Sequence, residues 1–238
     1  MEKITVKEPG ERLDNYLAKH LEITRSQVKK NIDNIYINNK NEKSGYILKE
    51  NDIITYEFKE DEEIKPENIK LDIIYEDEDI IIINKQNGLV VHPGAGKSNG
   101  TLVNALMYLS KNLSDINGEY RPGIVHRIDA YTTGLLVIAK NNESHNVLAQ
   151  EIKSKQAKRK YLAIVWGNIN NNTGTIDAPI GRDPNNRLKM KVTDINSKEA
   201  VTHFKVLKRF KRATLLEVEL ETGRTHQIRC HMEYIGHP

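Results

Sequence analysis

The sequence has almost no cysteine and no long apolar run, and both absences restrict what the protein can be. Its 238 residues contain one cysteine, Cys230, which excludes an intrachain disulfide and leaves a cysteine-rich zinc module without ligands. No stretch approaches the roughly 18 apolar residues of a membrane span, and the start "MEKITVKEPGERLDNYL" lacks the apolar core of a signal peptide. We therefore predict a cytoplasmic protein with no membrane partner and no redox chemistry.

Charge is distributed unevenly along the chain. Residues 1–56 carry 10 basic and 9 acidic side chains, residues 57–80 carry 3 and 11, and residues 81–238 carry 23 and 13. The modest net charge of +3 therefore conceals an acidic segment followed by a basic one. A basic excess attracts polyanions, of which nucleic acid is the commonest, but a solvated lysine-rich surface has the same composition.

The first part of the chain predicts two short helices followed by a small sheet. The run "ERLDNYLAKHL" has helical spacing, and Thr24 is suited to cap a second helix with three cations on its outer face, Arg25, Lys29 and Lys30. The runs "IYINNK" and "DIITYEF" have strand character and are joined by a loop containing Asn and Gly. Together with "YINN" and the step "RSQ", this pattern resembles the S4-type RNA-binding domain, assigned here to residues 1–58. The resemblance implies RNA contacts for the three cations. Without it, they are simply the solvent-exposed face of a helix.

The rest of the chain predicts a linker and a larger, strand-rich domain. Residues 59–78 are acidic and contain Pro66, so we predict a linker there. Strand-like runs follow at 80–85, 134–140, 161–167, 201–210 and 213–222, with helices expected at 101–112 and 141–156. Long strands with few helices between them predict an α+β fold with a mixed, mainly antiparallel sheet over residues 79–238. The chain stops at "RCHMEYIGHP", directly after a predicted helix, so we expect a C-terminal continuation.

One motif suggests a bound nucleotide. The stretch "HPGAGKSNGT" contains the GKS of a phosphate-binding P-loop. That motif needs a glycine five residues before Gly96, where Val91 stands, and the flanks do not read as strand, loop and long helix. We therefore interpret it as a glycine-rich loop and expect no nucleotide cofactor.

A second motif suggests a metal. The string "THQIRCH" places His226, Cys230 and His231 close together, but on a helix His231 lies about 100° from the face that the other two share. A metal would have to recruit His126 or Asp129 from elsewhere, and nothing in the spacing requires one. We expect no metal.

Three polar clusters each stand at the end of an apolar, strand-like run. They are "DIIIINKQNGLVVHPGAG", "GIVHRIDAYTTGLLVIAK" and "LETGRTHQIRCH". Rigid strands can present such groups to a common cleft. Asp129 then has candidate cationic partners, which are Arg127, Arg224 and Arg229. An opposite charge nearby keeps a partly buried carboxylate ionised, as a nucleophile or base requires, and a local salt bridge is the alternative.

These strings in this order, together with "KRKYLAIVWG", resemble the RluA/RluD-type pseudouridine synthases from about Asp79 to His231. The resemblance implies isomerisation of chosen uridines in structured RNA, with large-subunit ribosomal RNA expected before transfer RNA. It also implies that no cofactor takes part. We expect a monomer.

Carried over by position, the resemblance assigns roles to individual residues. Asp129 matches the essential carboxylate, which either attacks the sugar or assists proton removal from it. Tyr161 matches the active-site tyrosine, and Arg229 matches the basic partner of the aspartate. The residues expected to bind the substrate are His92, His126, Arg127, Ile128, Leu220 and Arg224.

The sequence also departs from the family pattern. Gln86 stands where proline is usual, Ile128 replaces leucine, and residues 130–133, "AYTT", replace a more polar Lys-Asp-Thr-Ser. These changes remove no proposed catalytic group. They therefore bear on which RNA the protein modifies more than on the type of reaction. Two other functions stay open: a non-catalytic RNA-binding or ribosome-assembly protein on the same fold, and a metal-dependent hydrolase using His126, His226 and His231.

Overall fold

The computed structural model describes the chain except for residues 59–63, 95–98, 111–112, 117, 119–120 and 187. It divides into two compact units, unit 1 (Met1–Glu63) and unit 2 (Ile64–Pro238). Within the described ranges, no helix is both long and apolar enough to cross a membrane. The P-loop-like "GKS" lies outside the described residues.

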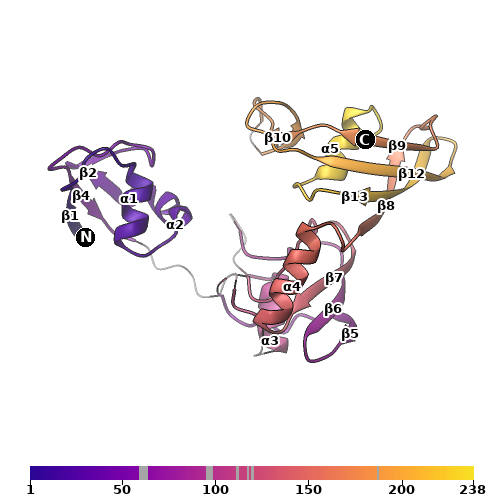
Figure 1. Cartoon of the computed structure of the whole chain (residues 1–238), viewed down its shortest axis with the longest axis horizontal. Helices are drawn as coiled ribbons and strands as arrows, with labels where there is room; N and C mark the ends of the chain where they lie inside the picture. The colour runs from indigo at the N-terminus through magenta and orange to yellow at the C-terminus, as the bar shows by residue number, and fades with distance from the viewer. Residues whose placement is uncertain (59–63, 95–98, 111–112, 117, 119–120, 187) are drawn as a thin grey trace. The chain divides into compact units, whose positions relative to one another are not determined.

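Unit 1 is a small sheet covered by two helices (Figure 1). Its strands β1 (Glu2–Thr5), β2 (Ile35–Ile37), β3 (Lys40–Asn41) and β4 (Ile53–Tyr56) pair antiparallel in the order β1-β4-β2-β3. The helices are α1 (Leu13–His20), α2 (Arg25–Lys30) and the short η1 (Ile32–Asn34). Their apolar sides pack on the sheet, with core members that include Leu13, Leu17, Val28, Ile35 and Ile54.

The predicted cap of the second helix is confirmed in atomic detail. The Thr24 hydroxyl accepts from the backbone N–H of Gln27 at 3.2 Å, and the Gln27 side chain accepts from the N–H of Thr24 at 2.8 Å. This reciprocal arrangement satisfies two backbone donors that a helix start otherwise leaves unpaired. The helix then exposes Arg25, Lys29 and Lys30, as expected.

The described residues of unit 2 form three antiparallel sheets and three helices. One sheet joins β5 (Asp72–Glu76), β6 (Ile80–Lys85) and β7 (Gly134–Ala139), and a second has the order β8-β13-β12-β9. The strands of the second are β8 (Arg159–Trp166), β9 (Thr173–Asp177), β12 (Val201–Arg209) and β13 (Ala213–Leu220); β10 (Ile180–Arg182) pairs with β11 (Met190–Val192). The helices are α3 (Leu102–Leu109), α4 (Asn142–Lys153) and α5 (Gln227–Tyr234). The predicted α+β, mainly antiparallel fold is confirmed.

The predicted linker is in part wrong. Residues 72–76 form β5, which pairs antiparallel with β6, while residues 59–63 lie outside the described residues. All five residues of β5 are exposed, because it is the edge strand of its sheet and is held by backbone pairing. An edge strand tolerates charge, so the acidic composition that suggested a linker did not exclude a strand.

Two apolar cores support the two larger sheets of unit 2. One core combines β6, β7 and α3 through residues such as Ile83, Leu106 and Leu136, and the other combines the second sheet with α5. Helix α4 lies against β7 (Figure 1). Tyr161 packs against both cores, which places the start of β8 where they meet.

Candidate active site

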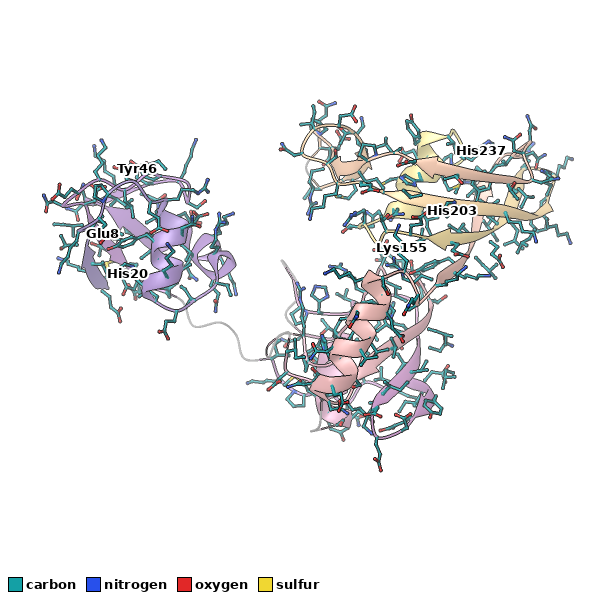
Figure 2. All side chains as sticks on the ribbon, in the orientation of Figure 1. Glu8, His20, Tyr46, Lys155, His203 and His237 are labelled. Atoms are coloured by element: carbon teal, nitrogen blue, oxygen red, sulfur yellow. The ribbon has the colours of Figure 1, made fainter. Side chains whose placement is uncertain are left out.

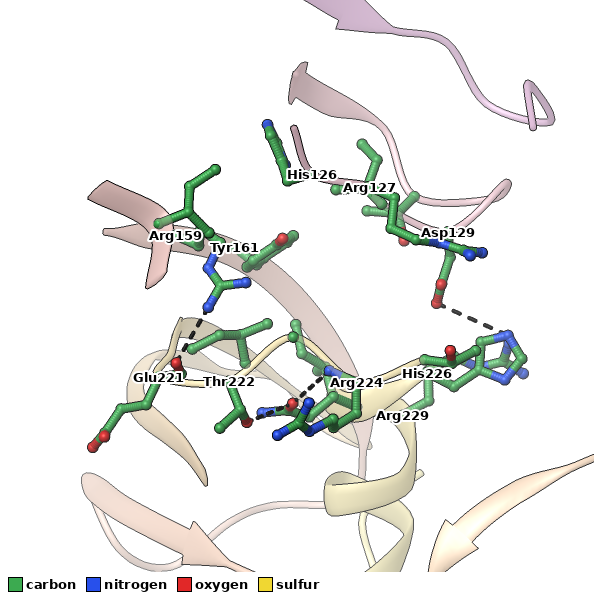
Figure 3. A pocket seen from close by; sticks show the side chains of 18 of the residues that line it. His126, Arg127, Asp129, Arg159, Tyr161, Glu221, Thr222, Arg224, His226 and Arg229 are labelled. Atoms are coloured by element: carbon green, nitrogen blue, oxygen red, sulfur yellow. Dashed lines mark hydrogen bonds and ion pairs between the residues drawn. The ribbon is translucent and has the colours of Figure 1, made fainter. Parts of the chain in front are cut away.

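A cavity of about 670 Å³ opens in unit 2 beside Tyr161 (Figure 3). Its walls come from the irregular segment before β7, the end of α4, the start of β8, the end of β13 and the turn into α5. All the predicted site residues of this unit except His92 line it: His126, Arg127, Ile128, Asp129, Tyr161, Leu220, Arg224 and Arg229. Segments far apart in the sequence therefore converge on one concave surface, as ligand sites require.

Asp129 lies in a turn whose backbone is hydrogen-bonded to a buried lysine. The ammonium of Lys85, at the end of β6, donates to the carbonyls of Ala130 and Leu89 at 2.9 Å and of Gln86 at 3.0 Å. The Lys85 side chain is fully buried, and this burial lowers its pKa, while the charge of Asp129 opposes the shift. Lys85 thereby ties the residue after Asp129 to the first sheet.

Among the described residues, His226 is the basic side chain found within 4.0 Å of the Asp129 carboxylate. Its Nε2 lies 4.0 Å from Asp129 Oδ2, an ion pair when the imidazole is protonated (Figure 3). His226 has a left-handed backbone, φ 56°, at the turn into α5, a conformation that non-glycine residues seldom adopt. Arg229 lines the same cavity, and among the described residues it makes no ion pair with Asp129 within 4.0 Å, so its pairing with the aspartate stays a prediction beside the observed His226 contact.

Tyr161 lies on β8 at the cavity wall. Burial raises the pKa of its phenol; the charge of Asp129 acts in the same direction and that of Arg159 opposes it. The hydroxyl therefore keeps its proton at neutral pH and can donate a hydrogen bond. Arg159, two residues earlier on the strand, donates to the carbonyl of Glu221 at 3.3 Å and pairs in register with Leu220.

His126 is a neutral ring in the wall. Burial, aided by the charge of Arg159, lowers its pKa to about 4. Its Nε2 accepts from the backbone N–H of Val137 at 3.2 Å, which assigns the ring proton to Nδ1. His126 therefore fixes the segment to β7 and is not placed as a base near neutral pH.

His92 lies behind Arg127 and does not line the cavity. Arg127 Nη1 lies 3.4 Å from His92 Nε2. Burial and then the charges of Arg121 and Arg127 lower the pKa of His92 to about 4, so its ring is neutral and can accept from the guanidinium. His92 is thus close to a wall residue without being one itself.

The rim on the α5 side is a hydrogen-bonded network. Glu221 pairs with Lys155, which follows α4, and accepts from His203 on β12 at 2.7 Å; both partners are labelled in Figure 2. These two hydrogen bonds lower the pKa of Glu221. Arg224 donates its Nε to the carbonyl of Glu199 at 2.8 Å. The network fixes the ends of β13 and α5 around the opening.

The comparisons with known proteins identify the family. A family model described as RNA pseudouridylate synthase matches residues 79–234. The chain belongs to this family. An RNA pseudouridine synthase, predicted from the motifs, is thereby confirmed as the class of enzyme.

Relatives and solved structures of this family match most of the chain. A protein of Bacillus subtilis named as an uncharacterized RNA pseudouridine synthase is 48% identical over 96% of this chain and 77% of its own length. The ribosomal large subunit pseudouridine synthase D of Escherichia coli is 42% identical over 96% of this chain and 71% of its own. A solved structure, human RNA pseudouridylate synthase domain containing 1, is 25% identical with a TM-score of 0.58; the match covers 71% of this chain and 66% of the human one, just under two thirds.

Of the donors considered for a metal, His226 and Asp129 lie close together, but His231 and His126 are engaged elsewhere. The ring of His231 is buried, with Nδ1 2.8 Å from the Thr202 hydroxyl and Nε2 2.9 Å from the Ala178 carbonyl oxygen. His126 is engaged with β7, as described above. In the part of the chain that the structure describes, no cluster of three His, Cys, Asp or Glu side chains could hold a metal ion.

Sequence reasoning did not name Arg159 and considered His226 only as a possible metal ligand, whereas the structure places both residues at the cavity that Asp129 and Tyr161 line. Arg159 stands in "KRKYLAIVWG" and His226 in "TGRTHQIRCH", so both lie within matched motifs. The order of the motifs predicted which elements form the site. It did not predict which of several neighbouring basic side chains would lie near the carboxylate. Tyr131, in the "AYTT" segment that departs from the family pattern, is 82% exposed and is not among the residues that line the cavity.

Proposed function

We propose that this protein isomerises specific uridines to pseudouridine in large-subunit ribosomal RNA. Family membership supports the reaction, and the name of the Escherichia coli relative supports the substrate class. The observation that carries the proposal is the convergence of Asp129, Tyr161 and Arg229 on one cavity within a family-matched chain.

The cavity suits the chemistry of this isomerisation. The N1–C1′ bond of the uridine breaks, the uracil turns, and C5 forms the new bond to C1′; C5 then loses its hydrogen as a proton and N1 takes one up. Breaking the bond to the sugar develops positive character there, which the Asp129 carboxylate stabilises either by attack on the sugar or by assisting proton removal from it. The detached uracil is retained because the site holds it away from bulk water.

For the other wall residues we propose the roles that the family resemblance implies. The Tyr161 phenol packs on the uracil base and takes part in the proton transfer. Ile128 and Leu220 form the apolar surroundings of the base. A target uridine has to leave its stack, at a cost of about a few kcal/mol. Contacts to the RNA offset this cost, and Arg127, Arg224 and Arg229 supply them at the cavity.

For unit 1 we propose an S4-type RNA-binding domain. The two short helices against a small antiparallel sheet agree with the pattern that carried the resemblance. Arg25, Lys29 and Lys30 are exposed on α2, as RNA contacts need to be. A cytoplasmic location and a monomeric state stay predictions from the sequence.

The reaction is tested by tritium release. Large-subunit ribosomal RNA transcribed with uridine tritiated at C5 should lose tritium to water when wild-type protein is added, since C5 exchanges its hydrogen for the sugar bond. Asp129→Asn should abolish release and retain RNA binding, whereas Asp194→Asn, an exposed site with the same change of charge, should retain both. Wild-type protein that binds this RNA without releasing tritium would support the non-catalytic RNA-binding alternative instead.

A further inference from the structure

A buried carboxylate lies beneath three cations on unit 1. Asp14, in the first turn of α1, has a side chain with no exposed surface. Arg12 donates to it twice, Nε to Oδ1 at 2.9 Å and Nη2 to Oδ2 at 3.1 Å. Arg25 donates to Oδ2 at 2.9 Å, and the Lys29 ammonium lies 3.8 Å from the same oxygen. One carboxylate thus gathers cations from the start of α1 and from α2.

The same three cations also face solvent. Their side chains are 45% exposed for Arg12, 52% for Arg25 and 53% for Lys29. The hydrogen bond from Arg12, followed by that from Arg25, holds the pKa of Asp14 well below its usual range although burial opposes this, so the carboxylate is ionised at physiological pH. Three positive charges against one negative charge leave the cluster cationic on its outer side.

We propose that Asp14 is a positioning residue that holds Arg12, Arg25 and Lys29 together as one preformed site for RNA backbone phosphate. The proposal rests on the proposed RNA-binding function of unit 1 and adds two residues to it, Arg12 and Asp14. Long cationic side chains lose rotamer freedom when they bind, and neighbouring cations repel one another. Asp14 removes both obstacles before RNA arrives, because it orders the three side chains and lies between their charges.

The alternative role for Asp14 is a clamp that only joins α1 to α2, which are in contact (Figure 1). The two roles predict opposite changes in RNA affinity for the substitution Asp14→Asn. Asp14→Asn removes a negative charge, so if unit 1 stays folded and only its charge matters, RNA affinity rises and the salt dependence steepens. If Asp14 positions the cations, affinity falls and the salt dependence flattens although the unit has become more positive.

The experiment measures binding of the full chain to a fluorescein-labelled fragment of large-subunit ribosomal RNA at several salt concentrations. We expect Asp14→Asn to bind at least about fivefold more weakly than wild type, with a shallower slope of log affinity against log salt. The control is Glu50→Gln, which makes the same charge change at an exposed site before β4 and should bind as well as wild type or slightly better. Equal or tighter binding by folded Asp14→Asn overturns the proposal.

A second pair of variants decides the matter if Asp14→Asn does not fold, as judged by circular dichroism. Arg12→Gln removes one cation of the cluster, and Lys7→Gln removes one exposed cation after β1. A preformed site predicts a loss of affinity at least about threefold larger for Arg12→Gln than for Lys7→Gln. Equal losses in this pair overturn the proposal.

Failure here is distinguishable from failure of the enzymatic proposal. Tritium release by wild-type protein reports on the Asp129 cavity, whereas the two variant pairs report on RNA binding by unit 1. If the wild type isomerises uridine but Asp14→Asn binds RNA as tightly as the wild type does, only the positioning role is rejected. A wild type that does not isomerise, combined with weakened Asp14→Asn, rejects only the reaction.

Discussion

His226 Nε2 lies 4.0 Å from the Asp129 carboxylate, across the cavity from the segment that carries the aspartate. The imidazole comes from the left-handed residue at which the chain turns into α5. A side chain placed by a strained backbone is a frequent feature of functional sites. We therefore expect His226 to influence Asp129 directly.

His226→Asn should lower the turnover of tritium release at saturating RNA by about tenfold, because Asp129 loses the imidazole that lies 4.0 Å from its carboxylate. Asparagine tolerates the left-handed backbone, so α5 should still begin at the same place. Arg229→Ala is the matched comparison from the same wall. A turnover unchanged in His226→Asn but reduced in Arg229→Ala would support Arg229 as the functional partner of Asp129.

Tyr161→Phe should fold normally and lose most of its turnover. The phenylalanine ring still packs against the two apolar cores. The variant lacks the hydroxyl, whose raised pKa keeps it protonated in the wild type, so it has no group for the proposed proton transfer. Tritium release and thermal unfolding of the same preparation separate the two effects. Full activity in Tyr161→Phe would limit this residue to packing.

Lys85→Met should destabilise the unit that holds the cavity by about 2 to 4 kcal/mol, since three carbonyls lose their buried donor. Denaturant unfolding of the full chain measures this, with Lys70→Met, in a less buried position, as the control. Tritium release should fall as well, because the turn after Asp129 is no longer fixed. A variant as stable and active as wild type would contradict the role given to Lys85.

The neutral histidines predict a pH dependence of stability. His126 and His92 fold with pKa values of about 4, below their ordinary value near 6.5, so the unfolded chain binds protons more readily between these limits. Stability should be full above about pH 6.5 and should fall as the pH drops towards 4, by at most roughly 2 kcal/mol per histidine between pH 7 and 5. His126→Gln keeps an acceptor for Val137 but does not titrate. It should lose less stability over this range than wild type, and an identical loss would show that His126 does not contribute.

Much of the fold could be read from local pattern. The caps at Thr24 and Asn141 were predictable because a side-chain oxygen three residues before a backbone donor is a local arrangement. Strands β6, β7, β8, β12 and β13 were predictable from β-branched or alternating runs. Edge strand β5 was missed because backbone pairing holds it while its side chains stay in water, so no apolar pattern marks it.

The sequence by itself determined the family, the class of reaction and the identity of the proposed carboxylate, because these depend on which residue types occur in which order. Only the tertiary structure decided the neighbours of that carboxylate. The His226 imidazole lies 4.0 Å from the Asp129 carboxylate, and the Lys85 ammonium helps to fix the turn that holds Asp129, through contacts between segments more than 40 residues apart along the chain. Spacing along a chain does not specify which of several cations will face one carboxylate. That choice follows from how the two sheets and α5 pack.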